Sequence, residues 1–208
     1  MVGAASLMSR RHAWLAFTAG GMPLSHSLST FAGARGRDDA RGWQQRLTAL
    51  QGRWYDVDAP PQVAAVFVLQ WLLQVPAHTA AHAAASGPWR AELGELTFDL
   101  GPSLVPSRVR LTTLVPDADP LAERLARAER DYRTVADPVA TAYPSAVRLG
   151  PRVRAALVDD MWSAARREAE AAAGLIRPGV PPRESCCLIY ALPGCVECAG
   201  CPRLRSTG

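Results

Sequence analysis

The five cysteines of this 208-residue chain lie close together near its end, at Cys186, Cys187, Cys195, Cys198 and Cys201. Isolated cysteines are usually small buried hydrophobic residues, whereas five in one short stretch are better explained by a shared metal or by cross-links. Crowded thiolates repel one another and oxidise, so a cation that neutralises them is the simplest explanation. Cys186-Cys187 and, after ten residues, Cys198-x2-Cys201 form two pairs, and a diiron cluster requires two thiolates for each iron.

The spacing of the cysteines is also compatible with disulfides, with zinc and with a cubane cluster. A disulfide framework would leave one thiol unpaired, and a bridge between the adjacent Cys186 and Cys187 would close a strained ring. Zinc suits the knuckle Cys198-x2-Cys201. Cys186 and Cys187 would be an unusual second pair of zinc ligands, because neighbouring side chains in an extended chain point to opposite faces. A cubane cluster suits the run C-x2-C-x2-C that ends at Cys201, with Cys186 or Cys187 as its fourth ligand. Of these arrangements, the cubane is the one that uses Cys195.

The residues around the cysteines narrow the choice. Residues 183–194 read RESCCLIYALPG, and CAGCP follows at residues 198–202. This segment resembles the C-terminal signature of the FhuF-type ferric-siderophore reductases, C-C-x10-C-x2-C, in its spacing and in its surrounding residues. The resemblance implies a [2Fe-2S] cluster with four ligands: Cys186, Cys187, Cys198 and Cys201. The same four cysteines are the implied catalytic residues, because they act through the cluster. Cys195 lies outside the pattern, either as a chance residue of a variable loop or as an alternative ligand.

The same resemblance implies a function. A protein of this kind reduces an Fe(III)-siderophore, of the hydroxamate type, to Fe(II) by one-electron transfer and releases the iron in the cytoplasm. The sequence has no dinucleotide-binding or P-loop glycine motif, so a separate electron donor such as a ferredoxin or an NAD(P)H-dependent reductase is expected. The alternative is a non-enzymatic zinc- or iron-sulfur-binding protein associated with iron uptake, with either a structural metal tail or the role of a plain electron carrier.

Composition excludes several classes of protein. The net charge is +4, and all 23 basic residues are arginines without a long basic run, so a nucleic-acid partner is not expected. The longest apolar run, residues 63–73, is shorter than the roughly 18 to 20 residues of a membrane span. Residues 9–15 resemble a twin-arginine export signal, but the apolar patch behind them is short. The cytoplasm, including the inner face of the membrane, is therefore the expected location.

The rest of the chain predicts an α+β fold with a mainly α-helical body, a small antiparallel β element and a short C-terminal cysteine-rich cluster-binding segment. The expected division is a siderophore-reductase-like body at residues 1–180 and a [2Fe-2S]-binding segment at residues 181–208. Helices are expected at residues 38–50, 60–85, 121–136 and 151–173, and strands at 92–100 and 108–114. Asp58 is the expected cap of the second helix, Pro76 is expected to kink that helix, Pro138 to end the third and Gly174 to cap the fourth.

Polar residues elsewhere in the chain have weaker patterns. His78 and His82 share a helix face and could bind a metal, but the glutamate of a metalloprotease motif is replaced by Thr79. These histidines are therefore expected to be surface or semi-buried helix residues. Carboxylates near the chain's last helix are expected to form a solvated face: Asp159, Asp160, Glu168 and Glu170.

Arginines and backbone amides near the cysteines can tune a cluster's potential by charge and hydrogen bonding. Arg183 and Arg203 flank the segment and are expected mainly to solvate a basic tail. The amides of residues 191–194 and 199–200 are the expected donors to the sulfurs. Three tryptophans are expected to fill the core: Trp71, Trp89 and Trp162.

Overall fold

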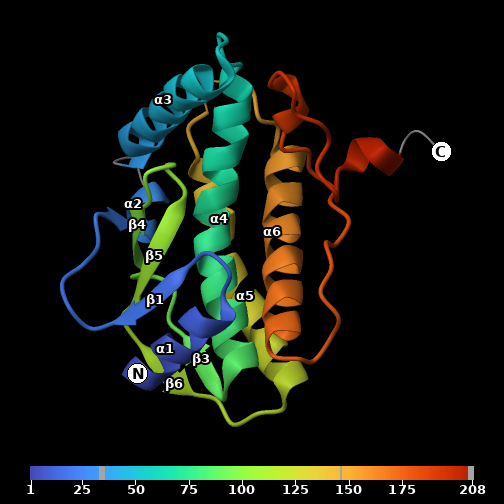
Figure 1. Ribbon diagram of the computed structural model, residues 1–208. Helices are drawn as coiled ribbons and strands as arrows, with labels where there is room; N and C mark the ends of the chain where they lie inside the picture. Colours follow the sequence, from blue (N-terminus) through green and yellow to red (C-terminus); the bar gives the residue numbers. More distant parts are fainter. Residues whose placement is uncertain (33–35, 146, 206–208) are drawn as a thin grey trace.

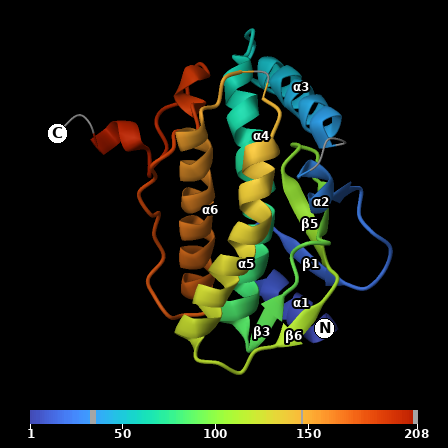
Figure 2. The same ribbon diagram turned by 180° about the vertical axis from the view of Figure 1, so that it is seen from behind.

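The computed structural model of the chain describes residues 1–32, 36–145 and 147–205. Its centre is the long helix α4 (Pro61–Ser86). Three further helices pack against α4, as Figures 1 and 2 show: α3 (Gly36–Tyr55), α5 (Leu121–Ala142) and α6 (Pro151–Ala172). The predicted α+β class with a mainly helical body is confirmed.

Helix α4 is buried because its sequence is apolar on nearly every side. Among the described residues it is the one helix that is long and apolar enough to cross a membrane, but 83% of its most apolar stretch is buried inside the fold. The helix is longer than the apolar run at residues 63–73, because it continues without interruption through Pro76 and the alanines beyond it. Its burial is that of a core helix.

This burial predicts a large stability effect in α4. Replacing Leu72, which is 0% exposed, with alanine will lower the free energy of unfolding by about 2 to 5 kcal/mol, because the removed side chain leaves a cavity. The matched control is Met22→Ala, at a side chain that is 85% exposed, where we expect a change of about 0.5 kcal/mol or less. Urea denaturation followed by far-UV circular dichroism measures both, and equal effects would contradict the central position of α4.

A small sheet lies on one side of α4 (Figure 1). Its four strands are β1 (Ala16–Ala19), β2 (His26–Ser27), β4 (Thr97–Leu100) and β5 (Pro106–Leu111). They lie in the order β1-β5-β4-β2, with β5 antiparallel to β4, β4 antiparallel to β2, and β1 parallel to β5. The predicted antiparallel pair is thus confirmed, in shorter form, and it belongs to a mixed sheet. A second small sheet pairs β3 (Trp89–Ala91) with β6 (Leu114–Pro116). The short helix α2 (Leu28–Phe31) directly follows β2.

The N-terminal residues are part of this body. Helix α1 (Val2–Arg11) packs beside β1 and buries Met8 completely. The Ser9 hydroxyl accepts a hydrogen bond from the Phe17 backbone N–H at 2.7 Å, which ties the end of α1 to β1. The segment that resembles an export signal in sequence therefore supplies core side chains of the fold.

The expected end of α5 at Pro138 and the expected Asp58 cap of α4 are wrong, and the expected Gly174 cap of α6 is confirmed. Helix α5 does not end at Pro138 but runs to Ala142, because Val139 and Ala140 are buried against the bundle and tertiary packing outweighs one lost backbone hydrogen bond. Helix α4 begins after Pro60, without a side-chain cap from Asp58. Gly174 follows the end of α6 with φ +76°, the left-handed conformation that glycine adopts without strain.

The last part of the chain turns back along α6. Figure 1 shows it leaving the end of α6 and running along that helix's outer side to the level of its first turns. Two short 3₁₀ turns lie in the returning part: η1 (Ile189–Ala191) and η2 (Pro202–Arg205). The division of the chain into residues 1–180 and 181–208 stays a prediction.

Candidate metal centre

The structure brings four of the five cysteine sulfurs together. Cys186 Sγ lies 3.9 Å from Cys201 Sγ, and Cys187 Sγ lies 3.8 Å from Cys198 Sγ. Each close pair joins one cysteine of the adjacent doublet to one of the later knuckle. The pairs that are neighbours in sequence are therefore not the pairs that are closest in space.

These distances fit thiolates that share a metal ion. Two ligands bonded at about 2.3 Å to a tetrahedral metal lie about 3.8 Å apart. A disulfide needs a sulfur separation of about 2.05 Å, and all five cysteines are free. A disulfide framework therefore does not describe this arrangement.

Burial makes the site unfavourable for free thiolates. Cys187 and Cys201 are 4% and 3% exposed. Burial raises the pKa of Cys186 and of Cys198, and the neighbouring sulfurs raise both further. A bound cation would remove this penalty by neutralising the thiolates.

Backbone geometry orients one of the sulfurs. Leu188 has φ +62°, and its N–H donates to Cys186 Sγ at 3.4 Å. The expected donors Ala191 and Leu192 do not play this role, since their N–H groups donate to the carbonyl oxygens of Leu188 and Ile189 and close the turn η1. Leu188, the residue before η1, supplies the hydrogen bond to sulfur instead.

The two ends of the cysteine segment are joined by the backbone. The Arg183 N–H donates to the Gly200 carbonyl at 2.9 Å. A Cβ at residue 200 would lie 2.7 Å from the Pro181 carbonyl oxygen, so this close approach requires glycine. The contact places Cys201 beside Cys186 although 15 residues separate them in sequence.

Asp160 of α6 holds the start of the segment. Its carboxylate accepts hydrogen bonds from the backbone N–H groups of Glu184 (2.9 Å) and Ser185 (2.8 Å), and from the Ser185 hydroxyl. Arg183 Nε lies 3.6 Å from the same carboxylate. The predicted solvated position of Asp160 is wrong, because the returning chain covers this residue and leaves it 5% exposed.

The two flanking arginines do more than solvate a tail. The Arg183 guanidinium donates to Gln70 of α4 at 3.1 Å and has a side chain only 13% exposed. It lowers the pKa of Cys198, against the larger effect of burial. Arg203 lies over the Tyr190 ring, 4.2 Å from its centroid. Both positive charges are thus held close to the sulfurs by specific contacts.

Cys195 points to a different partner. Its sulfur donates to the Tyr55 hydroxyl at 3.4 Å, and it packs with a small apolar cluster around Val63 and Leu192. A cubane cluster would need Cys195 beside the remaining sulfurs. Its contact with the end of α3 instead favours a four-cysteine site.

Comparison with known proteins agrees with this geometry. Residues 183–203 match the family model described as the FhuF 2Fe-2S C-terminal domain. No curated protein and no solved structure matches the chain. The resemblance to the FhuF-type family is thereby confirmed for the C-terminal segment, and this protein is an iron-sulfur protein with a [2Fe-2S] cluster. Residues 1–182 lie outside the match.

The predictions for the polar residues of α6 and α4 are partly confirmed. Asp159 and Glu170 form exposed ion pairs with Arg133 and Arg166, as a solvated face predicts. His78 and His82 are 2% and 0% exposed, so their predicted surface or semi-buried position is wrong.

Glu168 also departs from the expected solvated face, because it lies beside these two histidines. Its sequence neighbours give no sign of this contact.

Trp162 is buried as predicted, whereas Trp71 and Trp89 are half-buried at the edge of the core.

Proposed function

We propose that this protein is a ferric-siderophore reductase, which passes one electron to an Fe(III) chelate and so releases Fe(II). One observation carries the proposal: four thiols are paired at metal-thiolate distances inside the segment that matches the 2Fe-2S domain. Fe(III) is held tightly by hard anionic oxygens because of its high charge. Reduction lowers that charge, and the chelate then releases the ion.

We assign the ligands of the cluster to the two close pairs. Cys186 and Cys201 would hold one iron, and Cys187 and Cys198 would hold the other, because these are the sulfurs that lie closest together. Each pair combines a buried cysteine with a half-buried one. One edge of the centre therefore faces solvent, where a chelate or an electron donor can approach.

A bound [2Fe-2S] cluster supplies single electrons, at a potential set by charge, hydrogen bonds to sulfur and exposure. The chain provides the first two through its own residues. The Leu188 N–H donates to Cys186 Sγ, and the Arg183 and Arg203 charges lie near Cys198 and Cys186. Both effects favour the reduced, more negative state and raise the potential.

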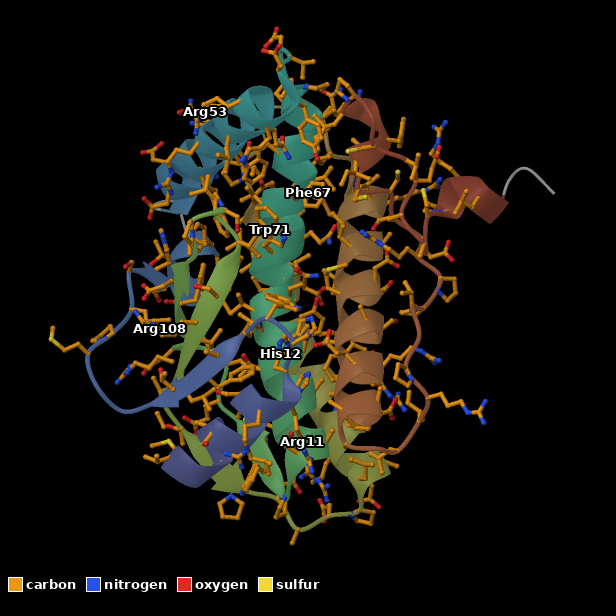
Figure 3. All side chains as sticks on the ribbon, in the orientation of Figure 1. Arg11, His12, Arg53, Phe67, Trp71 and Arg108 are labelled. Atoms are coloured by element: carbon orange, nitrogen blue, oxygen red, sulfur yellow. The ribbon has the colours of Figure 1, made fainter. Side chains whose placement is uncertain are left out.

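Helix α4 offers a surface for the chelate next to the cysteine segment. Phe67 packs against the small apolar cluster of Ala59, Val63 and Leu192, as Leu188 and Ile189 of that segment also do. Phe67 and Trp71 are half-buried and lie along the side of α4 that faces the space between β5 and α6 (Figure 3). Such aromatic rings suit the uncharged, partly apolar surface of a hydroxamate chelate.

The electrons come from a second protein in this proposal. No nucleotide-binding motif occurs in the sequence, so a ferredoxin or an NAD(P)H-dependent reductase is the expected donor. Val180, Val196 and Leu204 of the C-terminal part are 66%, 76% and 54% exposed, and we place the docking of the donor on this part of the chain, near the cluster. We place the reaction in the cytoplasm or at the inner face of the membrane, where imported chelates arrive.

A single-turnover experiment tests the proposal. The protein is reduced with dithionite, freed of excess reductant without oxygen, and mixed with a ferric trihydroxamate and a colorimetric Fe(II) chelator. We expect about one Fe(II) for each cluster, together with the return of the oxidised spectrum, because each cluster gives up one electron.

The control for this reaction is the Cys198→Ser protein, which should release no Fe(II) above background. A reduced wild-type protein that keeps its electron in the presence of ferric chelates would contradict the reductase function. If it then reoxidises on mixing with another redox protein, it is an electron carrier.

A further inference from the structure

A second group of ligand-bearing side chains lies between α1, α4 and α6. This histidine cluster consists of His12, His78, His82 and Glu168, whose ligand atoms all lie within 4.8 Å of one another. The two α4 residues are one helical turn apart and share a face. His12 follows α1 and reaches the lower half of α4 (Figure 3), while Glu168 comes from α6.

Part of this cluster has no hydrogen-bond partner among the residues that the structure describes. Both ring nitrogens of His82 and Oε1 of Glu168 are in this position, although all three atoms are buried. His82 is 0% exposed. Protein interiors rarely leave buried polar atoms unpaired, so the arrangement indicates a species that binds between them.

The role of His12 follows from its own hydrogen bonds. Its Nδ1 accepts the backbone N–H groups of Trp14 (3.2 Å) and Leu15 (2.9 Å). The proton of the neutral ring is therefore on Nε2, which lies 2.9 Å from His78 Nδ1 and 3.5 Å from Glu168 Oε1. A nitrogen that carries a proton is a donor and cannot ligate a cation.

The remaining three side chains offer lone pairs to an ion, although that of His78 Nδ1 accepts the His12 Nε2–H at 2.9 Å in this structure. Glu168 Oε2 lies 3.9 Å from His78 Nδ1, and Glu168 Oε1 lies 4.0 Å from His82 Nε2. Metal bonds to nitrogen and oxygen of about 2.0 to 2.2 Å put two ligands of a tetrahedral ion about 3.3 to 3.6 Å apart. An ion that binds here therefore draws these ligand atoms, which all lie within 4.8 Å of one another, closer together.

The surroundings keep the histidines unprotonated. Burial lowers the pKa of His82 to about 4 and that of His78 well below its usual value, so protons do not compete for their lone pairs near neutral pH. Arg11, whose charge also acts on His82, opposes a cation there. The Glu168 carboxylate offsets this charge, and its side chain is 34% exposed, which gives an ion a path from solvent.

We propose that His78, His82 and Glu168 bind a divalent first-row transition-metal ion, with His12 positioning the Glu168 carboxylate through its Nε2–H. Two imidazoles and one carboxylate form a donor set that suits Zn²⁺ and Fe²⁺. When the ion occupies the lone pair of His78, the His12 Nε2–H donates to Glu168, and a histidine–carboxylate contact of this kind is typical behind metal ligands.

This site is separate from the cysteine centre but is built on the same two helices. Gln70 and Asp160 anchor the cysteine segment, and His78 and Glu168 follow them eight residues later on α4 and α6. Eight residues correspond to about 12 Å along a helix. The proposal does not rest on the reductase function, because metal content is measured without any substrate.

The test uses the full chain with its cluster in place, freed of exchangeable metal and titrated with Zn²⁺. Bound zinc, iron and sulfide are measured after removal of free metal, and Fe²⁺ is tested in the same way without oxygen. We expect one zinc per chain in addition to the cluster iron, with no loss of iron. Zinc that binds only by displacing iron, or a chain that binds neither zinc nor added Fe²⁺, would overturn the proposal.

Variants separate the ligands from the positioning residue. Glu168→Gln, at a partly exposed side chain that tolerates the change, and His82→Ala should each weaken zinc binding by about 100-fold or more, while His12→Ala should weaken it by about 10- to 100-fold. The matched control is His26→Ala, which removes the one histidine of the chain that lies outside the cluster and should leave zinc binding unchanged. Unchanged affinity in folded Glu168→Gln protein would disprove the site, and complete loss in His12→Ala would disprove the positioning role.

Discussion

Substituting serine for Cys187 will produce a folded protein that is nearly colourless. Cys187 is buried, and its sulfur lies 3.8 Å from that of Cys198. A serine hydroxyl is a poor ligand for iron in a site built from thiolates. We expect bound cluster iron to fall by at least about tenfold, since removing even a residue behind a metal ligand costs 10- to 100-fold in affinity. Visible absorption per chain and iron content measure the loss.

The control for this substitution is Cys195→Ser. Cys195 contacts Tyr55, and a serine hydroxyl preserves a hydrogen bond there. This protein should keep its full colour and iron content. Loss of the chromophore in Cys195→Ser as well as in Cys187→Ser would contradict the four-cysteine assignment and favour a cubane cluster.

Replacing Asp160 with asparagine will detach the cysteine segment from α6. The carboxylate accepts three hydrogen bonds from Glu184 and Ser185 and lies beside Arg183. An asparagine side chain would turn its NH₂ group toward these donors and remove the negative charge beside the largely buried Arg183. Removing one partner of a buried ion pair costs about 3 to 5 kcal/mol. Urea denaturation and the rate at which the visible spectrum fades should both show the change.

The neighbouring Asp159 provides a matched control on the same helix. Its side chain is 55% exposed and pairs with Arg133, and exposed pairs contribute about 0 to 1 kcal/mol. Asp159→Asn should therefore leave stability and cluster lifetime nearly unchanged. If the two variants behave alike, the carboxylate of Asp160 is not the anchor of the segment.

Much of the helical framework could be predicted from local patterns. The apolar residues of α4, the Gly150-Pro151 start of α6 and the Gly174 stop are all signals within a few residues of one another. The continuation of helix α5 past Pro138 was not predictable in this way, because it depends on packing against other helices. Strand β1 is not predictable for the same reason, since its partner β5 lies about 90 residues away.

The clustering of the cysteines was predictable because they lie within one short signature, which also matches the 2Fe-2S family model. The anchor was not, since nothing in the sequence around Asp159 and Asp160 tells which carboxylate the returning chain will cover. Asp160 lies 25 residues before Ser185 in the chain, and the contact exists only once the segment has turned back along α6.

The histidine cluster shows the same limit more strongly. The spacing of His78 and His82 correctly predicts a shared helix face. Their neighbours His12 and Glu168 come from opposite ends of the chain, and His12 stands 66 residues before His78. Spacing alone therefore indicates two candidate ligands, and only the fold supplies the carboxylate.

Iron, zinc and acid-labile sulfide, measured together in protein purified without oxygen, test the cysteine centre most directly. The Glu168→Gln protein is the best sample, because metal at the histidine cluster then adds little to the count. Four thiolates around a [2Fe-2S] cluster predict two irons and two sulfides per chain. A protein that contains zinc and neither iron nor sulfide would contradict the iron-sulfur centre, and with it the proposed reduction of ferric chelates.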